Sequence, residues 1–209
     1  MPPEPRLVPR FAAEPPQDLL PYGRWAERLH EEFLAACLAI DAEGEDLGDP
    51  GEVLWYPDRT WHGRTFVAAT THTTTDYELY GYVSFAPAQD GREPDDFFAI
   101  ADFTADTAQA NPDWAIDLCD EVVGTWRGEQ SNAAAMTLVW GRPMVQGAEI
   151  ATAELAGLAV DQCPLVEGRF TLLAPDDYRG DTLDVKLFDR RGKELASESL
   201  YAQDGEDGA

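Results

Sequence analysis

Between residues 22 and 41 the chain alternates apolar and charged positions with the period of an α-helix. The apolar positions, at intervals of four, four, four and three residues, are Trp25, Leu29, Phe33, Cys37 and Ile40. This spacing places them on one face of a helix, while the remaining positions carry mainly acidic, basic or small residues. The pattern therefore predicts an amphipathic helix over 22–41 whose apolar face packs on the rest of the fold.

From residue 53 onward, short segments rich in β-branched and aromatic residues, separated by turn-forming residues, predict β-strands. The predicted strands of this part are 53–56, 64–73, 77–85, 97–103 and 136–141. The segment 55–85 is rich in Trp and Tyr and forms an aromatic hairpin at the centre of the prediction. Its second strand carries bulky residues on both faces, so we expect both faces to be covered.

A second helix is predicted in the middle of the chain. Asn111-Pro112-Asp113 combines an N-cap residue, a proline at the first helical position and an acidic residue near the positive end of the helix. The apolar residues spaced by four that follow it, and the glycine expected to end the helix, are Trp114, Leu118, Val122 and Gly124.

Short strands with turns between them follow residue 143, over roughly 149–160, 166–174, 182–189 and 194–202. The predicted fold class is α+β: a mainly antiparallel sheet packed by an N-terminal and a mid-chain helix, followed by a small all-β meander or subdomain. The predicted division is an extended proline-rich arm (1–20), an α+β core domain (21–145), a β-rich subdomain (146–203) and an acidic tail (204–209).

Charge changes the picture of what the protein contacts. Forty Asp and Glu face fifteen Lys and Arg, for a net charge of −25, and only Lys186 and Lys193 are lysines. Such a chain repels phosphate backbones and anionic membranes, so neither direct nucleic-acid binding nor membrane insertion is expected. Acidic residues in nearly every segment are typical of proteins from salt-in halophiles, although an acidic protein that binds a basic partner would look similar.

Two groups of residues are candidates for a site. Asp58, His62, His72 and Asp76 could form a metal site if the hairpin strands pair in a suitable register, but their spacing fits no known motif. Paired carboxylates for acid–base chemistry could come from Asp102, Asp106, Asp113 and Asp117, although a chain with forty acidic residues contains such pairs by coincidence. No nucleophile motif occurs around any serine. We therefore predict no catalytic residues, no metal ligands and no cofactor.

The three cysteines are Cys37, Cys119 and Cys163, which are widely spaced, lie in apolar surroundings and are expected to be small buried residues. The first sixteen residues lack the apolar core of a signal peptide, and no apolar run approaches eighteen residues. Neither a leader nor a membrane span is therefore expected.

The aromatic residues expected at an interaction surface are Trp61, Tyr80, Tyr82 and Trp126. Together these features favour a non-catalytic structural or interaction subunit of a homo-oligomer or multi-protein assembly in a high-salt milieu. The most concrete version is a head or tail component of a virus of a halophilic host, located in the virion or in the cytoplasm of that host. The alternatives are a small-molecule- or metal-binding α+β cup, with enzymatic activity uncertain, and an acidic module that neutralises a basic partner.

Overall fold

A computed structural model of the chain describes residues 20–21, 23–88, 93–127, 133–176 and 181–200. The described elements are one helix and twelve strands: α1 (Gly23–Cys37), β1 (Leu54–Trp55), β2 (Arg59–Trp61), β3 (Arg64–His72), β4 (Glu78–Ala86), β5 (Asp95–Thr104), β6 (Ile116–Arg127), β7 (Ala133–Pro143), β8 (Ile150–Leu155), β9 (Leu158–Pro164), β10 (Phe170–Asp176), β11 (Leu183–Phe188) and β12 (Glu194–Ser199). The predicted arm, apart from its last residue, and the predicted acidic tail lie outside the described residues.

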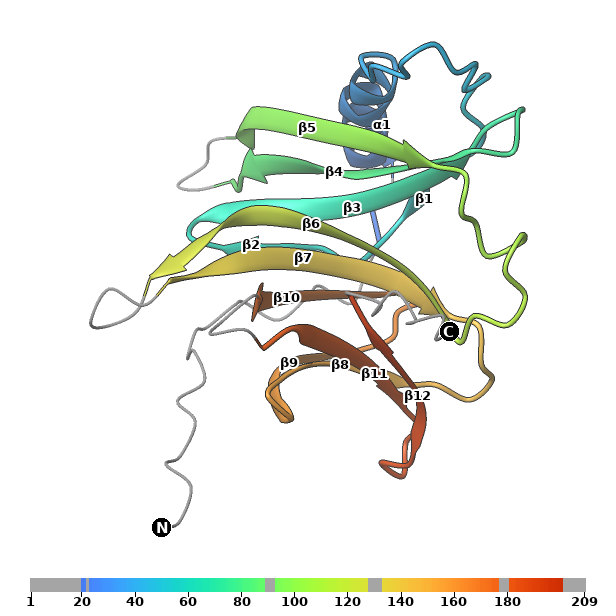
Figure 1. Cartoon of the computed structure of the whole chain (residues 1–209). Helices are drawn as coiled ribbons and strands as arrows, with labels where there is room; N and C mark the ends of the chain where they lie inside the picture. The colour runs from blue at the N-terminus through green and yellow to red at the C-terminus, as the bar shows by residue number, and fades with distance from the viewer. Residues whose placement is uncertain (1–19, 22, 89–92, 128–132, 177–180, 201–209) are drawn as a thin grey trace.

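The strands form three antiparallel sheets. In the first sheet β1 and β2 both pair with β3, which is followed by β4 and β5. The second sheet has the order β10-β7-β6, and the third has the order β12-β11-β8-β9. The helix and the three sheets are stacked as four layers, with α1 at one end and the third sheet at the other (Figure 1).

The N-terminal helix covers the outer face of the first sheet, as its apolar stripe predicts. Leu29, Phe33 and Cys37 are buried against apolar side chains of β3 and β4 such as Val67 and Val83. The helix ends at Cys37, and the next residue, Leu38, is 81% exposed. The helix prediction over 22–41 is thus confirmed over Gly23–Cys37.

The opposite face of the first sheet packs on the second sheet. Tyr82 of β4 and Phe66 of β3 lie in one core cluster with Leu138 and Trp140 of β7. Both faces of β4 are therefore covered, as expected, and the second cover is a sheet of the same chain.

The last of the three interfaces between layers is that of the second and third sheets. Side chains such as Val139, Phe170 and Val185 are fully buried there. The C-terminal strands do not all belong to the third sheet, because β10 pairs along its length with β7. The strands after residue 145 thus contribute to two of the three sheets. The division into domains at that residue stays a prediction.

The predicted mid-chain helix is wrong: β6 occupies Ile116–Arg127 and pairs with β7. Asn111 instead begins a turn, in which its carbonyl oxygen accepts a hydrogen bond from the Trp114 N–H (3.1 Å). A spacing of four residues is also a multiple of two, so Leu118 and Val122 lie on one side of β6 just as they would on one side of a helix, whereas Trp114 lies in the turn before the strand. Pairing with β7 decided between the two structures.

The described helix is too short to cross a membrane.

Candidate functional site

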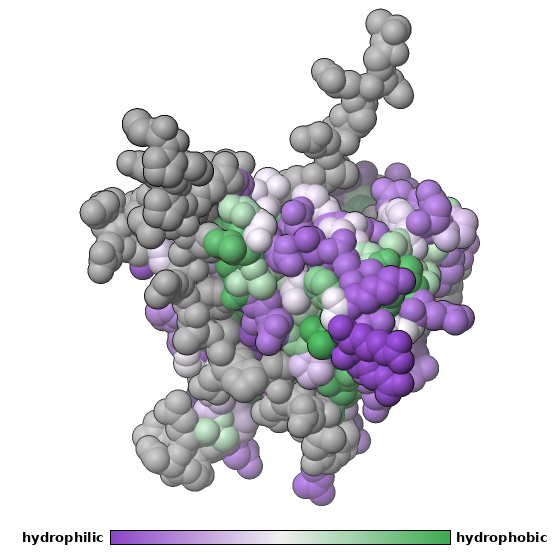
Figure 2. Space-filling view, turned by 90° about the horizontal axis from the view of Figure 1, so that it is seen from below, coloured by the Kyte–Doolittle hydropathy of each residue, from purple (hydrophilic) through white to green (hydrophobic). Residues whose placement is uncertain are grey.

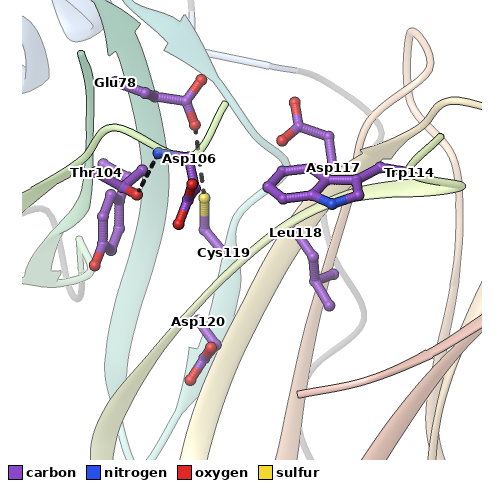
Figure 3. Close-up of a pocket in the computed structure, with 9 residues that line it drawn as sticks. Glu78, Thr104, Asp106, Trp114, Asp117, Leu118, Cys119 and Asp120 are labelled. Atoms are coloured by element: carbon purple, nitrogen blue, oxygen red, sulfur yellow. Dashed lines mark hydrogen bonds between the residues drawn. The ribbon is translucent and has the colours of Figure 1, made fainter. Parts of the chain in front are cut away.

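A pocket of about 290 Å³ opens where β4 begins, β5 ends and β6 begins (Figure 3). Four of its lining residues are carboxylates, namely Glu78, Asp106, Asp117 and Asp120. The others are Tyr80, Thr104, Trp114, Leu118 and Cys119. The pocket is thus lined by acidic and aromatic side chains, and no lysine or arginine is among these residues.

The topology explains why residues so far apart in sequence meet here. Glu78 at the start of β4 pairs with Thr104 at the end of β5. The chain then leaves the first sheet through residues 105–115 and enters the second sheet as β6. The Thr104 hydroxyl accepts a hydrogen bond from the Asp106 N–H (3.0 Å) and so fixes the start of this crossover. The pocket lies at the point where the chain passes between sheets.

Glu78 is the most deeply buried carboxylate of the pocket, with 4% of its surface exposed. Its Oε2 atom lies 3.3 Å from Nε2 of His72, and its Oε1 atom accepts a hydrogen bond from the Cys119 thiol (3.9 Å). Burial is the main cause that raises the pKa of Glu78 from 4.5 to about 7. The nearby charge of Asp117 contributes in the same direction, whereas Arg142 and the Cys119 hydrogen bond oppose it. Glu78 therefore changes its charge near neutral pH.

Asp117 has a strong partner of its own. Its Oδ2 atom accepts a hydrogen bond from Nε of Arg142 (2.6 Å), and its side chain is 9% exposed. This guanidinium at the end of β7 offsets negative charge at Asp117 and Glu78. The nine residues that line the pocket include four carboxylates and no lysine or arginine, so their side chains carry an excess of negative charge whenever the carboxylates are ionised.

Cys119 lies between Glu78 and the core. Burial raises the pKa of the Cys119 thiol well above 9, and the charges of Glu78 and Asp117 raise it further. The group is therefore a neutral thiol, which is a poor nucleophile. It serves as a hydrogen-bond donor to Glu78, as Figure 3 shows.

A second pocket of about 460 Å³ lies beside the first and is lined by His72, Thr73, Asp76, Ala105, Thr107, Gln109 and Ala110. Nε2 of the His72 ring lies 3.2 Å from the Gln109 side-chain nitrogen and 3.3 Å from Oε2 of Glu78. The His72–Glu78 pair therefore joins the two pockets.

The four residues that were candidates for a metal site do not converge. His62 lies in the turn after β2, with its ring 4.4 Å from that of Trp61, whereas His72 ends β3. The nine residues of β3 span about 30 Å, so the two histidines lie at opposite ends of a strand. Asp58 directly precedes β2 at the His62 end, and only His72 and Asp76 line a common pocket. Within the described ranges, no three His, Cys, Asp or Glu side chains are placed to hold a metal ion.

The aromatic residues predicted at an interaction surface pack within the chain. Tyr82 is 5% exposed in the core between the first and second sheets, and Trp61, Tyr80 and Trp126 are partly buried against the same core. Of the four, Tyr80 also lines the acidic pocket. Burial raises the pKa of Tyr80 to about 12, and carboxylates such as Asp102 add to the effect, so its hydroxyl stays protonated at neutral pH.

Among the candidate carboxylates, Asp106 and Asp117 do line the pocket, whereas Asp102 and Asp113 do not. Sequence reasoning missed Glu78, Cys119 and Asp120 as members of a site. A signal for Glu78 was present in the sequence, because Glu78, Tyr80 and Tyr82 are spaced by two residues and lie on the same covered face of β4. A carboxylate at such a position is costly to bury unless it is neutral, paired or functional.

No family model, no curated protein and no solved structure matches this chain.

Proposed function

We propose that this chain is a non-catalytic binding subunit that holds a positively charged group of a ligand or partner protein in the acidic pocket. The observation that carries the proposal is the meeting of four carboxylates with the Trp114 and Tyr80 side chains in one pocket. Carboxylates form charge-assisted hydrogen bonds with ammonium and guanidinium groups, and aromatic faces attract the same cations.

The electrostatics of Glu78 support this assignment. A carboxyl group whose pKa lies near 7 is held in a place where its negative charge is poorly compensated. A cation bound beside it would favour the ionised form and lower this pKa. Binding is therefore expected to release a proton near neutral pH, which distinguishes this pocket from an exposed group of acidic residues.

The high net charge supports a high-salt milieu for the same subunit. Hydrophilic side chains are spread over the face below the third sheet, with isolated apolar groups between them (Figure 2). Molar salt screens attraction between exposed charges to a few ångströms, whereas partly buried pairs are screened much less. A pocket that encloses the cation is therefore the kind of acidic site that keeps its affinity in such a milieu. Assembly into a virion stays a prediction.

A second candidate function is proton-transfer catalysis. Glu78 has the pKa of an effective general base at neutral pH, and it contacts His72. An enzyme of this kind would take a substrate with an acidic C–H or O–H group into the same pocket. Turnover lost in Glu78→Gln would favour this candidate, whereas cation binding without turnover favours the first.

The test is calorimetric titration with methylguanidinium and tetramethylammonium ions in low and molar KCl. Measurements in two buffers of different ionisation enthalpy report the proton released by Glu78. We expect saturable binding that weakens about tenfold in Glu78→Gln and in Asp120→Asn. Asp113→Asn is the matched control, because Asp113 is exposed and lies outside the pocket. Absence of saturable binding at both salt concentrations, or equal affinity in all three variants, would show the proposal to be wrong.

A further inference from the structure

Two edge strands border one open side of the molecule, next to the acidic pocket. β5 is the last strand of the first sheet and β6 is the last strand of the second sheet. Within the described ranges, no further strand pairs with the outer edge of either one. The Ile116 N–H at the start of β6 donates to Oε1 of Glu198 (3.0 Å). Beyond this residue, the outer edge of the twelve-residue strand presents backbone N–H and C=O groups for pairing.

Side chains along this open side are incompletely covered. Phe98 of β5 lies on the face opposite the helix and is 52% exposed. Val122 of β6 is 53% exposed and lies on the face that it shares with Leu118, toward the third sheet. These two are among the few large apolar side chains on the described surface with more than half of their area in solvent. Apolar surface of this kind beside a free strand edge is typical of a place where another chain docks.

The charges on this side determine which chain can dock. Asp120 and Glu121 lie on β6, and Asp102 lies on the facing strand β5. Burial raises the pKa of Glu121, and repulsion from Asp120 and Asp102 raises it further. Glu121 is thus close enough to Asp120 and to Asp102 to be repelled by both, and a positive charge placed beside Glu121 would offset that repulsion.

The same features disfavour pairing between two copies of this chain. Two β6 edges brought together would place acidic residues opposite acidic residues, which destabilises a strand pair. The register of β6 also shifts between Val122 and Gly124, and such irregularities protect a natural edge from self-association. The acidic residues of β6 would therefore attract a basic strand and repel a second copy of β6.

We propose that an extended, basic segment of a partner protein adds to the free edge of β6 as a further strand, with one of its Lys or Arg side chains in the acidic pocket. The inference rests on the proposed function, because β6 supplies Asp117, Cys119 and Asp120 to that pocket. Backbone pairing supplies a second, charge-independent part of the affinity, which remains at high salt.

The test uses a synthetic peptide of about seven residues that alternates Lys or Arg with Val or Thr, and a matched peptide that is N-methylated at every second amide. We expect the first peptide to bind and to slow amide exchange along residues 117–123, and the methylated peptide to bind at least about tenfold more weakly. Glu121→Lys should weaken binding of the first peptide about tenfold. Glu52→Lys, which adds the same charge at an exposed residue before β1, should leave binding nearly unchanged.

The outcomes separate this inference from the proposed function. Equal binding of the two peptides, with small cations still bound in the pocket, would overturn strand addition and leave cation binding intact. Failure of both peptides and of the small cations would overturn both. Concentration-dependent dimerisation without peptide, with slowed exchange along β6, would assign the edge to a second copy and also overturn the inference.

Discussion

The Arg59 guanidinium of β2 and the Asp161 carboxylate of β9 form a buried ion pair that links the first sheet to the third. Nη2 of Arg59 lies 2.9 Å from both carboxylate oxygens, and the two side chains are 2% and 11% exposed. Nη1 of Arg59 also donates to the Thr171 carbonyl oxygen of β10 (3.4 Å), and Asp161 accepts a hydrogen bond from the Leu173 N–H (2.8 Å). One ion pair therefore ties together an edge of each sheet.

Removing only the arginine should destabilise the fold strongly. Arg59→Met keeps most of the side-chain volume but leaves Asp161 buried without its cation, which is expected to cost about 3–5 kcal/mol. Urea unfolding at fixed salt measures the loss. The double variant Arg59→Met/Asp161→Leu should regain part of it, because no unpaired charge remains, although the Leu173 N–H then lacks its acceptor. A loss below about 1 kcal/mol in the single variant would show that the pair is not important for stability.

The contact between Trp61 and Gly124 predicts a steric effect. A Cβ atom at Gly124 would lie 2.7 Å from Cζ3 of Trp61, and this contact joins β2 to β6 across the first two sheets. We expect Gly124→Ala to cost about 1–3 kcal/mol through overpacking. In a double-mutant cycle, Trp61→Leu should remove most of that additional cost.

Gly141 provides the matched control for this cycle. A Cβ atom there would lie 2.3 Å from the carbonyl oxygen of Asp117, so the obstacle is backbone. Trp61→Leu should therefore not relieve Gly141→Ala. Equal coupling of Trp61 to both glycines would contradict the steric explanation.

The raised pKa of Glu78 predicts how stability depends on pH. The folded protein holds this proton more tightly than the unfolded chain, with a pKa of about 7 compared with 4.5. The stability that the proton contributes is therefore complete below about pH 4.5 and is lost as pH rises through 7. The Glu78→Gln variant does not show this loss, because glutamine does not titrate in this pH range. Urea unfolding of both proteins from pH 5 to 8 measures this effect. The free energy of unfolding of the variant, relative to that of the parent, should increase by up to about 3 kcal/mol over this range. A difference that stays constant across this range would mean that Glu78 does not titrate there.

The net charge of −25 predicts that salt stabilises the fold. Self-repulsion among carboxylates opposes the compact state, and added KCl screens it. Thermal unfolding between 0.1 and 2 M KCl should give a Tm that rises steadily and by at least about 4 °C, which corresponds to roughly 1–2 kcal/mol for a chain of this size. A near-neutral protein treated alike should show a smaller rise. A flat or falling Tm would count against a high-salt milieu.

Local patterns predicted α1 and β4. The stripe from Trp25 to Cys37 predicted α1, and the alternation in 77–85 predicted a strand with both faces covered. The pattern failed at 114–122, where a spacing of four residues is compatible with both helix and strand. The acidic pocket could not be predicted, because Glu78 and Cys119 are forty-one residues apart and meet only through the stacking of two sheets.

The sequence by itself determined the N-terminal helix, the antiparallel strands and the acidic surface, because periodicity and charge are properties of neighbouring residues. The tertiary structure alone decided that β6 is a strand, that β10 joins β7, and that the carboxylates of three segments share one pocket. These outcomes depend on pairing and stacking between residues distant in the chain. Burial, together with the neighbouring charge of Asp117, gives Glu78 a pKa near 7, and both depend on contacts between distant segments.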